Sequence, residues 1–191
     1  MSHLLERLRH EHANVRRLLA MLEAQVSVLD RRGRLDWDII QGVIEYLLAY
    51  PDLRHHPLED GLLRHLEARD AAAAEPFLGL EAEHREQSQA LRRIAAATHQ
   101  VLRDESLARQ GYVGLLSSFI AAQRHHIRKE EAGFFPATER ALDAADWAEL
   151  DGEVPELKDA LSADQVERRF AALRGNLELW DSLDRWQRQT D

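Results

Sequence analysis

Histidine and glutamate recur one helical turn apart in two separate stretches of the chain. In RHHIRKEEAGFF, His126 precedes Glu130 by four positions, and in RHHPLEDGLL, His55 precedes Glu59 by four. Residues four apart on a helix lie on one face, about 5–6 Å from each other. Each pair could therefore direct an imidazole and a carboxylate at a common point. One such pair is ordinary on a helix surface, whereas two copies indicate a shared cause.

Two further histidines interrupt apolar seams elsewhere in the chain. His12 stands between Leu8 and Val15, and His84 follows Leu80, in each case at a spacing that predicts a helix face turned toward a core. A buried imidazole or carboxylate without a partner costs several kcal/mol. Six such groups in the core of a small protein would destabilise the fold severely unless a cation compensated their charge and lone pairs.

The number and kind of these groups predict a metal site with two ions. Mixed imidazole and carboxylate ligands suit iron, manganese or zinc. Six protein ligands are too many for one catalytic ion that keeps a free position, and about right for two ions bridged by both carboxylates. The predicted ligands are His12, His55, Glu59, His84, His126 and Glu130.

The second-helix pair has a competing register, His56 with Asp60. His55 with Glu59 is preferred, because these two continue the apolar seam of that helix and align with the copy in the fourth helix. Two tyrosines lie upstream, Tyr46 and Tyr50. They are interpreted as core aromatics, with a phenol ligand to the metal as the alternative.

Four helical seams must position these groups. Apolar residues spaced three and four apart predict one amphipathic helix for each seam. The seams are Leu5, Leu8, His12, Val15, Leu19, Leu22, Val26 and Leu29; Ile40, Val43, Leu47, His55, Glu59, Leu62 and Leu66; Phe77, Leu80, His84, Gln87 or Ser88, Leu91, Ile94, Thr98 and Val101; and Tyr112, Leu115, Phe119, Ala122, His126, Glu130, Gly133 and Ala137.

The helix boundaries follow from capping residues and prolines. Ser2 and Asp36 are expected N-caps, and Gly33 is expected to end the first helix. Two prolines predict a break or kink in the second helix within residues 50–57. The stretch ARDAAAAEP is expected to close the second helix, and the third is expected to begin at its end, near Pro76.

Four long helices with short connections predict an all-α, up-down-up-down four-helix bundle. The bundle is expected to span residues 1–142. Residues 143–191 are expected to form a C-terminal helical tail packed on it through tryptophans, with a last helix over 163–189.

Composition narrows the partners and the location. The net charge of −9 argues against nucleic acid or an anionic membrane surface as a partner. The absence of cysteine excludes thiolate-ligated zinc and iron–sulfur clusters. No apolar run has the length of a membrane span. The N-terminal stretch MSHLLERLRHEH lacks the apolar core of a signal peptide, so a cytoplasmic location is expected.

The six predicted ligands, in their order along the chain, resemble the hemerythrin-like proteins, also called HHE cation-binding domains. EAEHREQ, HHIRKEEAGFFP and YPDLRHHPLEDGLL carry the resemblance, which covers roughly residues 1–142. It implies a left-handed four-helix bundle around a non-heme di-iron centre with an oxo or hydroxo bridge, with manganese or zinc as alternatives. Glu59 and Glu130 would bridge the ions. It also implies a small partner, such as dioxygen, nitric oxide or peroxide, in sensing or a stress response.

Two positions depart from the oxygen-carrying members of that family. Those members have a second histidine one turn after the third-helix histidine, where this chain has Ser88. They also place the last histidine and carboxylate five apart, a spacing that His125 and Glu130 would satisfy. The resemblance is therefore to the bacterial four-histidine, two-glutamate type rather than to a reversible oxygen carrier.

Other functional classes have weaker support in the sequence. An interaction module is the main alternative, with a structural metal and a tail over 143–191 that contacts a protein partner. A ferritin-like oxidase needs two Glu-x-x-His motifs, and Glu81 with His84 supplies one. A zinc hydrolase of the His-Glu-x-x-His type has no counterpart here. The pattern does not separate ligand binding from enzymatic turnover.

Overall fold

The computed structural model describes residues 3–30, 35–51, 55–103 and 109–153, and these are almost entirely helical, without a strand among them. The elements are α1 (His3–Asp30), α2 (Trp37–Tyr50), α3 (His56–Arg69), α4 (Ala71–Ala74), the 3-10 turn η2 (Glu75–Phe77), α5 (Leu80–Arg103), α6 (Arg109–Lys129), the π-helical turn η3 (Glu130–Phe134), α7 (Phe135–Ala141) and α8 (Ala144–Glu153).

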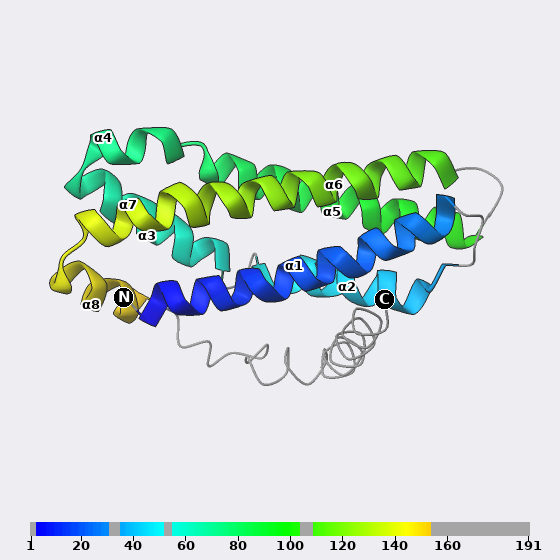
Figure 1. Ribbon diagram of the computed structural model, residues 1–191, viewed down its shortest axis with the longest axis horizontal. Coiled ribbons are helices and arrows are strands. Elements are labelled where there is room, and N and C mark those ends of the chain that lie inside the picture. Colours follow the sequence, from blue (N-terminus) through cyan, green and yellow to red (C-terminus); the bar gives the residue numbers. More distant parts are fainter. Residues whose placement is uncertain (1–2, 31–34, 52–54, 104–108, 154–191) are drawn as a thin grey trace, which may run out of the picture.

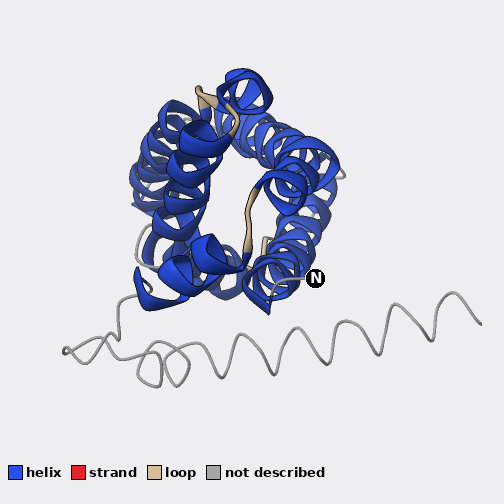
Figure 2. Cartoon of the chain, turned by 90° about the vertical axis from the view of Figure 1, so that its left-hand side faces the viewer, coloured by secondary structure: helices blue, strands red, loops and turns tan. Residues whose placement is uncertain are grey.

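These elements form four long antiparallel segments that surround a common axis (Figures 1 and 2). The first is α1, the second α2 with α3, the third α5, and the fourth α6 with η3 and α7. Around the axis, α1 and α5 each pack against both α2 and α6, and at the other end of the molecule α3 packs against α5 and α7. The predicted all-α four-helix bundle is confirmed. None of the described helices has the length and apolar character needed to cross a membrane.

The break or kink predicted in the second segment appears as an interruption of the α-helix, and the residues described between its two parts, Pro51 and His55, are π-helical. Helix α2 ends at Tyr50 and α3 begins at His56, with Pro57 in its first turn, where a missing N–H breaks no helical hydrogen bond. The predicted cap Asp36 also holds, because its carboxylate accepts a hydrogen bond from the Ile39 N–H at 3.1 Å. The caps predicted at Ser2 and Gly33 lie outside the described residues.

The predicted start of the third helix near Pro76 is wrong. Asp70 ends α3 and caps a separate short helix, α4, by accepting a hydrogen bond from the Ala73 N–H at 3.0 Å. The stretch that contains Pro76 forms the 3-10 turn η2. The long helix starts only at Leu80, after the Gly79 carbonyl has accepted hydrogen bonds from the N–H groups of Ala82 and Glu83. An aspartate side chain that competes for backbone N–H groups stops a helix that alanine propensity would continue.

The seam predicted for the fourth helix is wrong at two positions. Leu115 is 40% exposed and Ala122 is exposed, whereas Leu116 is fully buried. Periodicity cannot choose between adjacent leucines, and the polar Gln123 occupies the inward position in place of Ala122, because its amide hydrogen-bonds across to α5.

The buried core is divided by a polar layer. One apolar cluster joins α2 to the C-terminal half of α1, the C-terminal half of α5 and most of α6. The other joins the start of α1 to α3, α7 and α8. Between them, each of the four segments contributes buried histidine or glutamate side chains instead of apolar ones. The bundle therefore has two apolar ends and a titratable middle.

Helix α8 packs against α3, and Trp147 packs against the second apolar cluster. Asp146 stabilises the first turn of α8, because it accepts hydrogen bonds from Arg69 Nε at 3.0 Å and from the Asp143 N–H at 2.9 Å. The predicted tail helix over 163–189, with its tryptophans, lies outside the described residues.

The π-helical turn η3 interrupts the fourth segment just before Pro136. Proline cannot donate to the carbonyl four residues earlier, and its ring clashes with that carbonyl. A π-type turn, which inserts about one extra residue into the helix, re-pairs the backbone nearby. Here the Phe135 N–H donates to the Glu130 carbonyl. Gly133 lies inside this turn and faces the ring of Phe77.

We expect Gly133→Ala to destabilise the protein. The added Cβ would lie 2.9 Å from Cζ and 3.1 Å from Cε1 of Phe77, whose ring is held against Phe134 with centroids 5.5 Å apart. Overpacking of this kind costs about 1–2 kcal/mol after alanine's better helix propensity is counted. The measurement is the free energy of unfolding in urea.

The matched control is Gly114→Ala, where a Cβ would meet nothing within 4 Å. This substitution should stabilise the protein by up to about 1 kcal/mol. In a Phe77→Leu background the cost of Gly133→Ala should shrink, and a cost that stayed the same would contradict the assigned clash.

Candidate metal centre

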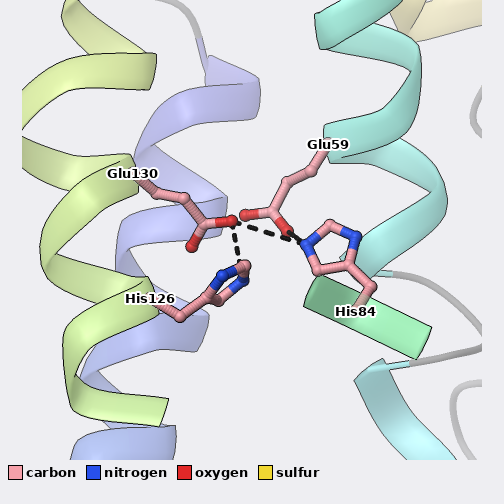
Figure 3. A group of neighbouring side chains, drawn as sticks. All are labelled: Glu59, His84, His126 and Glu130. Atoms are coloured by element: carbon pink, nitrogen blue, oxygen red, sulfur yellow. Dashed lines mark ion pairs between the residues drawn. The ribbon is translucent and has the colours of Figure 1, made fainter. Parts of the chain in front are cut away.

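The structure brings all six predicted residues together in the polar layer between the apolar clusters. Within the described part of the chain they form two groups, each with ligand atoms that all lie within 4.8 Å of one another. One group is His12, His55 and Glu59, and the other is Glu59, His84, His126 and Glu130 (Figure 3). None of the six is more than 6% exposed.

The carboxylate of Glu59 lies between two pairs of imidazoles. Its Oε1 is 3.1 Å from His55 Nε2 and 3.5 Å from His12 Nε2. Its Oε2 is 3.4 Å from His84 Nε2. One oxygen thus faces the His12 and His55 pair while the other faces the pair of His84 and His126.

Glu130 spans the same two pairs from the opposite segment of the bundle. Its Oε1 is 2.9 Å from His126 Nε2 and 3.5 Å from His84 Nε2, and its Oε2 is 3.3 Å from His12 Nε2. Each of the two carboxylates therefore divides its oxygens between the two histidine pairs.

Five of these inward atoms, among the described residues, lack a hydrogen-bond partner. In the described residues, both oxygens of Glu59, both oxygens of Glu130 and Nε2 of His84 are buried without one. The Nε2 atoms of His12 and His55 face each other at 2.9 Å, a contact that needs a proton or a cation to offset the repulsion of two lone pairs. Unsatisfied buried acceptors at this density are very costly. The chemistry of the donor set therefore fits bound cations.

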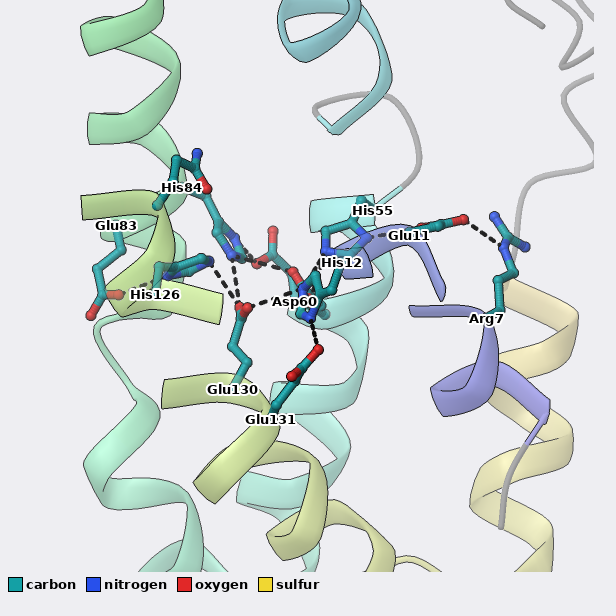
Figure 4. Close-up of polar contacts among 12 residues, drawn as sticks. Arg7, Glu11, His12, His55, Asp60, Glu83, His84, His126, Glu130 and Glu131 are labelled. Carbon is teal, nitrogen blue, oxygen red and sulfur yellow. Dashed lines mark hydrogen bonds and ion pairs between the residues drawn. The ribbon is translucent and has the colours of Figure 1, made fainter. Parts of the chain in front are cut away.

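A ring of four outer carboxylates holds the four imidazoles from behind (Figure 4). Each carboxylate contacts the Nδ1 of a histidine on the neighbouring helical segment. The pairs are Glu11 with His55 at 2.8 Å, Asp60 with His84 at 3.1 Å, Glu83 with His126 at 2.9 Å and Glu131 with His12 at 3.2 Å.

This ring assigns the tautomer of each imidazole. An ionised carboxylate only accepts hydrogen bonds, so Nδ1 must carry a proton and donate it. In a neutral imidazole the lone pair then lies on Nε2, which points to the centre. Carboxylates behind metal-ligating histidines act in this way, fixing ring orientation and raising the basicity of the ligand.

Cations on the outer side of the ring support three of these carboxylates. Arg7 Nε donates to Glu11 at 3.0 Å, Arg16 donates to Glu131 at 2.8 Å and Lys129 Nζ donates to Glu83 at 2.6 Å. From the surface inward, a basic side chain is followed by a carboxylate and then by an imidazole. The arrangement holds these outer carboxylates in fixed orientations.

Glu11, Glu83 and Glu131 were not among the predicted site residues, and Asp60 entered only as the alternative ligand paired with His56. Their signal in the sequence is adjacency: each is the immediate neighbour of a predicted ligand, as in the pairs Glu11–His12, Glu59–Asp60, Glu83–His84 and Glu130–Glu131. Successive residues point in different directions around a helix, so one faces the centre while the other reaches the next helix. Asp60 therefore stands behind His84 and does not pair with His56.

The remaining candidates lie outside the two groups. His56 is buried and stacks flat on His84, with ring centroids 4.0 Å apart and an interplanar angle of 8°. Tyr46 packs against the first apolar cluster, as predicted for a core aromatic. His125 is exposed, so its neighbour His126 is the one that faces the layer. The side chain of Tyr50 lies outside the described residues.

The charges in the layer shift the titration of its members. Burial would lower the pKa of His55, but the Glu59 charge and the hydrogen bond to Glu11 raise it to about 10. Burial likewise opposes the charged form of His84, and contacts with Asp60 and Glu130 raise its pKa to about 9. Burial and the Glu130 charge would raise the pKa of Glu59, but His55 and His12 lower it to about 2. Without metal, protons on His55 and His84 therefore offset negative charge of the buried carboxylates.

Comparison with known families gives one result. The model of the hemerythrin HHE cation binding domain matches residues 3–138, which contain all six residues of the two groups. No curated protein and no solved structure matched the chain.

We expect the metal-free protein to be most stable between pH 4.5 and 6.5. The raised pKa values of His55 and His84 give stability that is complete below their ordinary value of 6.5 and is lost as pH rises through about 9 to 10. The lowered pKa of Glu59 gives stability that is complete above 4.5 and is lost as pH falls toward about 2. Thermal melting with chelator present, measured across this pH range, tests both limits.

Metal loading should release protons near neutral pH. A metal ion binds the unprotonated nitrogen, so imidazoles whose pKa is raised above 7 must lose a proton when the ion enters. Calorimetric titration with zinc in two buffers of different ionisation enthalpy counts these protons. The number of protons obtained from the pH dependence of melting, measured with and without metal, should agree with the calorimetric number. Zinc uptake without proton release would contradict the charge state assigned here.

We expect Glu83→Gln to weaken metal binding about ten- to hundredfold, because His126 loses its ionised acceptor. Competition against a chelating dye measures the change. Glu81→Gln is the control, since Glu81 lies on the same helix, is exposed and pairs with Arg85. Equal affinities for the two variants would rule out a role for the ring in metal binding.

Proposed function

Because the chain belongs to the hemerythrin HHE cation-binding family, we propose that it is a non-heme di-iron protein that binds or reacts with dioxygen, nitric oxide or peroxide in sensing or a stress response. Family membership carries cation binding. The choice of iron, the number of ions and the small ligand are the proposal.

The observation that carries the proposal is the split of each carboxylate between two histidine pairs. Glu59 turns one oxygen to His12 and His55 and the other to His84. Glu130 turns one oxygen to His126 and the other to His12. Two carboxylates that each direct one oxygen at either histidine pair suit two adjacent ions better than one. A single ion would leave carboxylate oxygens without a partner.

In this proposal the carboxylates of Glu59 and Glu130 and the Nε2 atoms of the four histidines would hold the two ions. Imidazole and carboxylate together suit iron, with manganese and zinc as alternatives. When bound, a pair of iron ions would supply redox chemistry and open coordination positions for a small ligand.

The residues of the chain have three tasks around such a site. The four outer carboxylates hold a proton on each Nδ1 and so keep Nε2 available. The two apolar clusters keep bulk water from either end of the layer. The phenyl ring of Phe135 stacks on His12, with centroids 5.4 Å apart, and limits the movement of that imidazole. Geometry and dryness are thus set by the protein before any ligand arrives.

The test compares adjacent histidines. We expect untagged protein to contain two iron ions per chain, with a visible absorption band that shifts on adding azide or nitric oxide. His126→Ala should lose iron, because this imidazole faces both Glu130 and Glu83. His125→Ala should keep it, since that side chain is exposed.

The outcome separates the two functional classes. A large drop in melting temperature on chelation, with no spectrum that responds to ligands, would favour a structural metal in an interaction module. Equal iron content in the two histidine variants would refute the assigned ligands.

A further inference from the structure

Two hollows adjoin the polar layer and share His126 as a wall. The larger is a surface groove of about 390 Å³ between α5 and α6. The smaller, of about 20 Å³, lies within the bundle beside His12, His55 and His56. A cavity of that size holds roughly one molecule as large as water, which is also the scale of a diatomic gas.

A hydrogen-bonded pair of glutamines stands between the two hollows. Gln87, on α5, lines the groove, and Gln123, on α6, lines the inner cavity. Gln123 Nε2 donates to Gln87 Oε1 at 2.8 Å. Gln87 is 8% exposed. This contact ties α5 to α6 at the level of the site, and it explains why a polar residue occupies the inward position at 123.

The lining of the groove favours an uncharged ligand. Its apolar residues are Ala90, Ile94, Leu115, Phe119 and Ala122. Leu115, 40% exposed, is one of three large apolar side chains with substantial exposure among the described residues. Glu83 and Glu86 add acidic groups to the lining, and Arg93 adds a basic one. An ion of either sign would have to shed hydration water to cross the apolar part of the groove, whereas a neutral diatomic molecule does not bear that cost.

We propose that the groove between α5 and α6 is the route by which a small neutral ligand reaches the metal centre, and that the Gln87–Gln123 hydrogen bond closes this route. The proposal rests on the proposed function and adds to it a path and a gate. Opening requires rotation of one glutamine side chain, a movement that needs no change in the helices.

Gln87→Ala tests the gate. Removing the acceptor should raise the association and dissociation rates of nitric oxide with the reduced, iron-loaded protein by the same factor, about three- to tenfold, the equivalent of one lost hydrogen bond. The dissociation constant should stay unchanged, because a route does not alter its end points. Gln89→Ala, an exposed glutamine on the same helix, is the control. Unchanged rates, or a change in affinity alone, would overturn the proposal.

Adjacent serines test the route. Ser118 lines the groove and Ser117 does not. Both are exposed. Ser118→Trp should cover the groove and slow both rates, while Ser117→Trp should leave them as in the parent protein. Equal rates in the two tryptophan variants would show that the ligand enters elsewhere.

A measurement without metal separates this proposal from the proposed function. In the metal-free protein, exchange of the Gln123 side-chain amide hydrogens with solvent, followed by NMR, reports opening of the pair. Gln87→Ala should speed this exchange and Gln89→Ala should not. Protein that binds no iron but shows this difference would refute the di-iron function and keep the gate, whereas equal exchange would refute the gate whatever metal is bound.

Discussion

Buried charge without enough protein partners is the constraint on which this structure depends. Two glutamates lie fully buried in a layer that divides the apolar core, and neither of their carboxylates has a hydrogen-bond partner among the residues that the structure describes. Burial of unpaired carboxylates is tolerated only where protons or cations neutralise them. The four imidazoles can supply the first, and bound metal the second. The need for neutralisation thus links the stability of the fold to the chemistry of the site.

The helices are locked around the layer in a repeating way. On each segment a residue that faces the centre is followed or preceded by a carboxylate that reaches the next segment. A rotation of any helix would therefore disturb an inward ligand and the orientation of a neighbour's imidazole together. Packing alone would allow such rotations among apolar side chains of similar size. The polar contacts select one rotation for each helix.

Much of this architecture follows from residue spacing, and the exceptions have physical causes. Four apolar seams with histidines in place identified the bundle and the six residues that converge. Spacing could not decide between Leu115 and Leu116, or expect an inward Gln123 whose partner lies on another helix. Spacing placed the end of the second helix in ARDAAAAEP, as observed, but it did not predict the separate short helix α4, which Asp70 caps by accepting a backbone hydrogen bond. The contacts of the outer carboxylates could not be predicted from spacing, because each joins residues far apart in sequence and periodicity describes one helix at a time.

The contact between Glu131 and His12 closes the ring across 119 positions of sequence. Every other link of the ring spans far fewer positions, the longest being the 44 between Glu11 and His55. During synthesis a growing chain that ends before the fourth segment has three of its imidazoles in place, yet it lacks Glu130 and the acceptor for His12. A complete centre can therefore assemble only once α6 and η3 of the fourth segment have left the ribosome. Chains truncated upstream of that point would leave the apolar faces that the fourth segment covers exposed beside an incomplete centre, and exposed apolar surface makes a chain prone to aggregation and degradation.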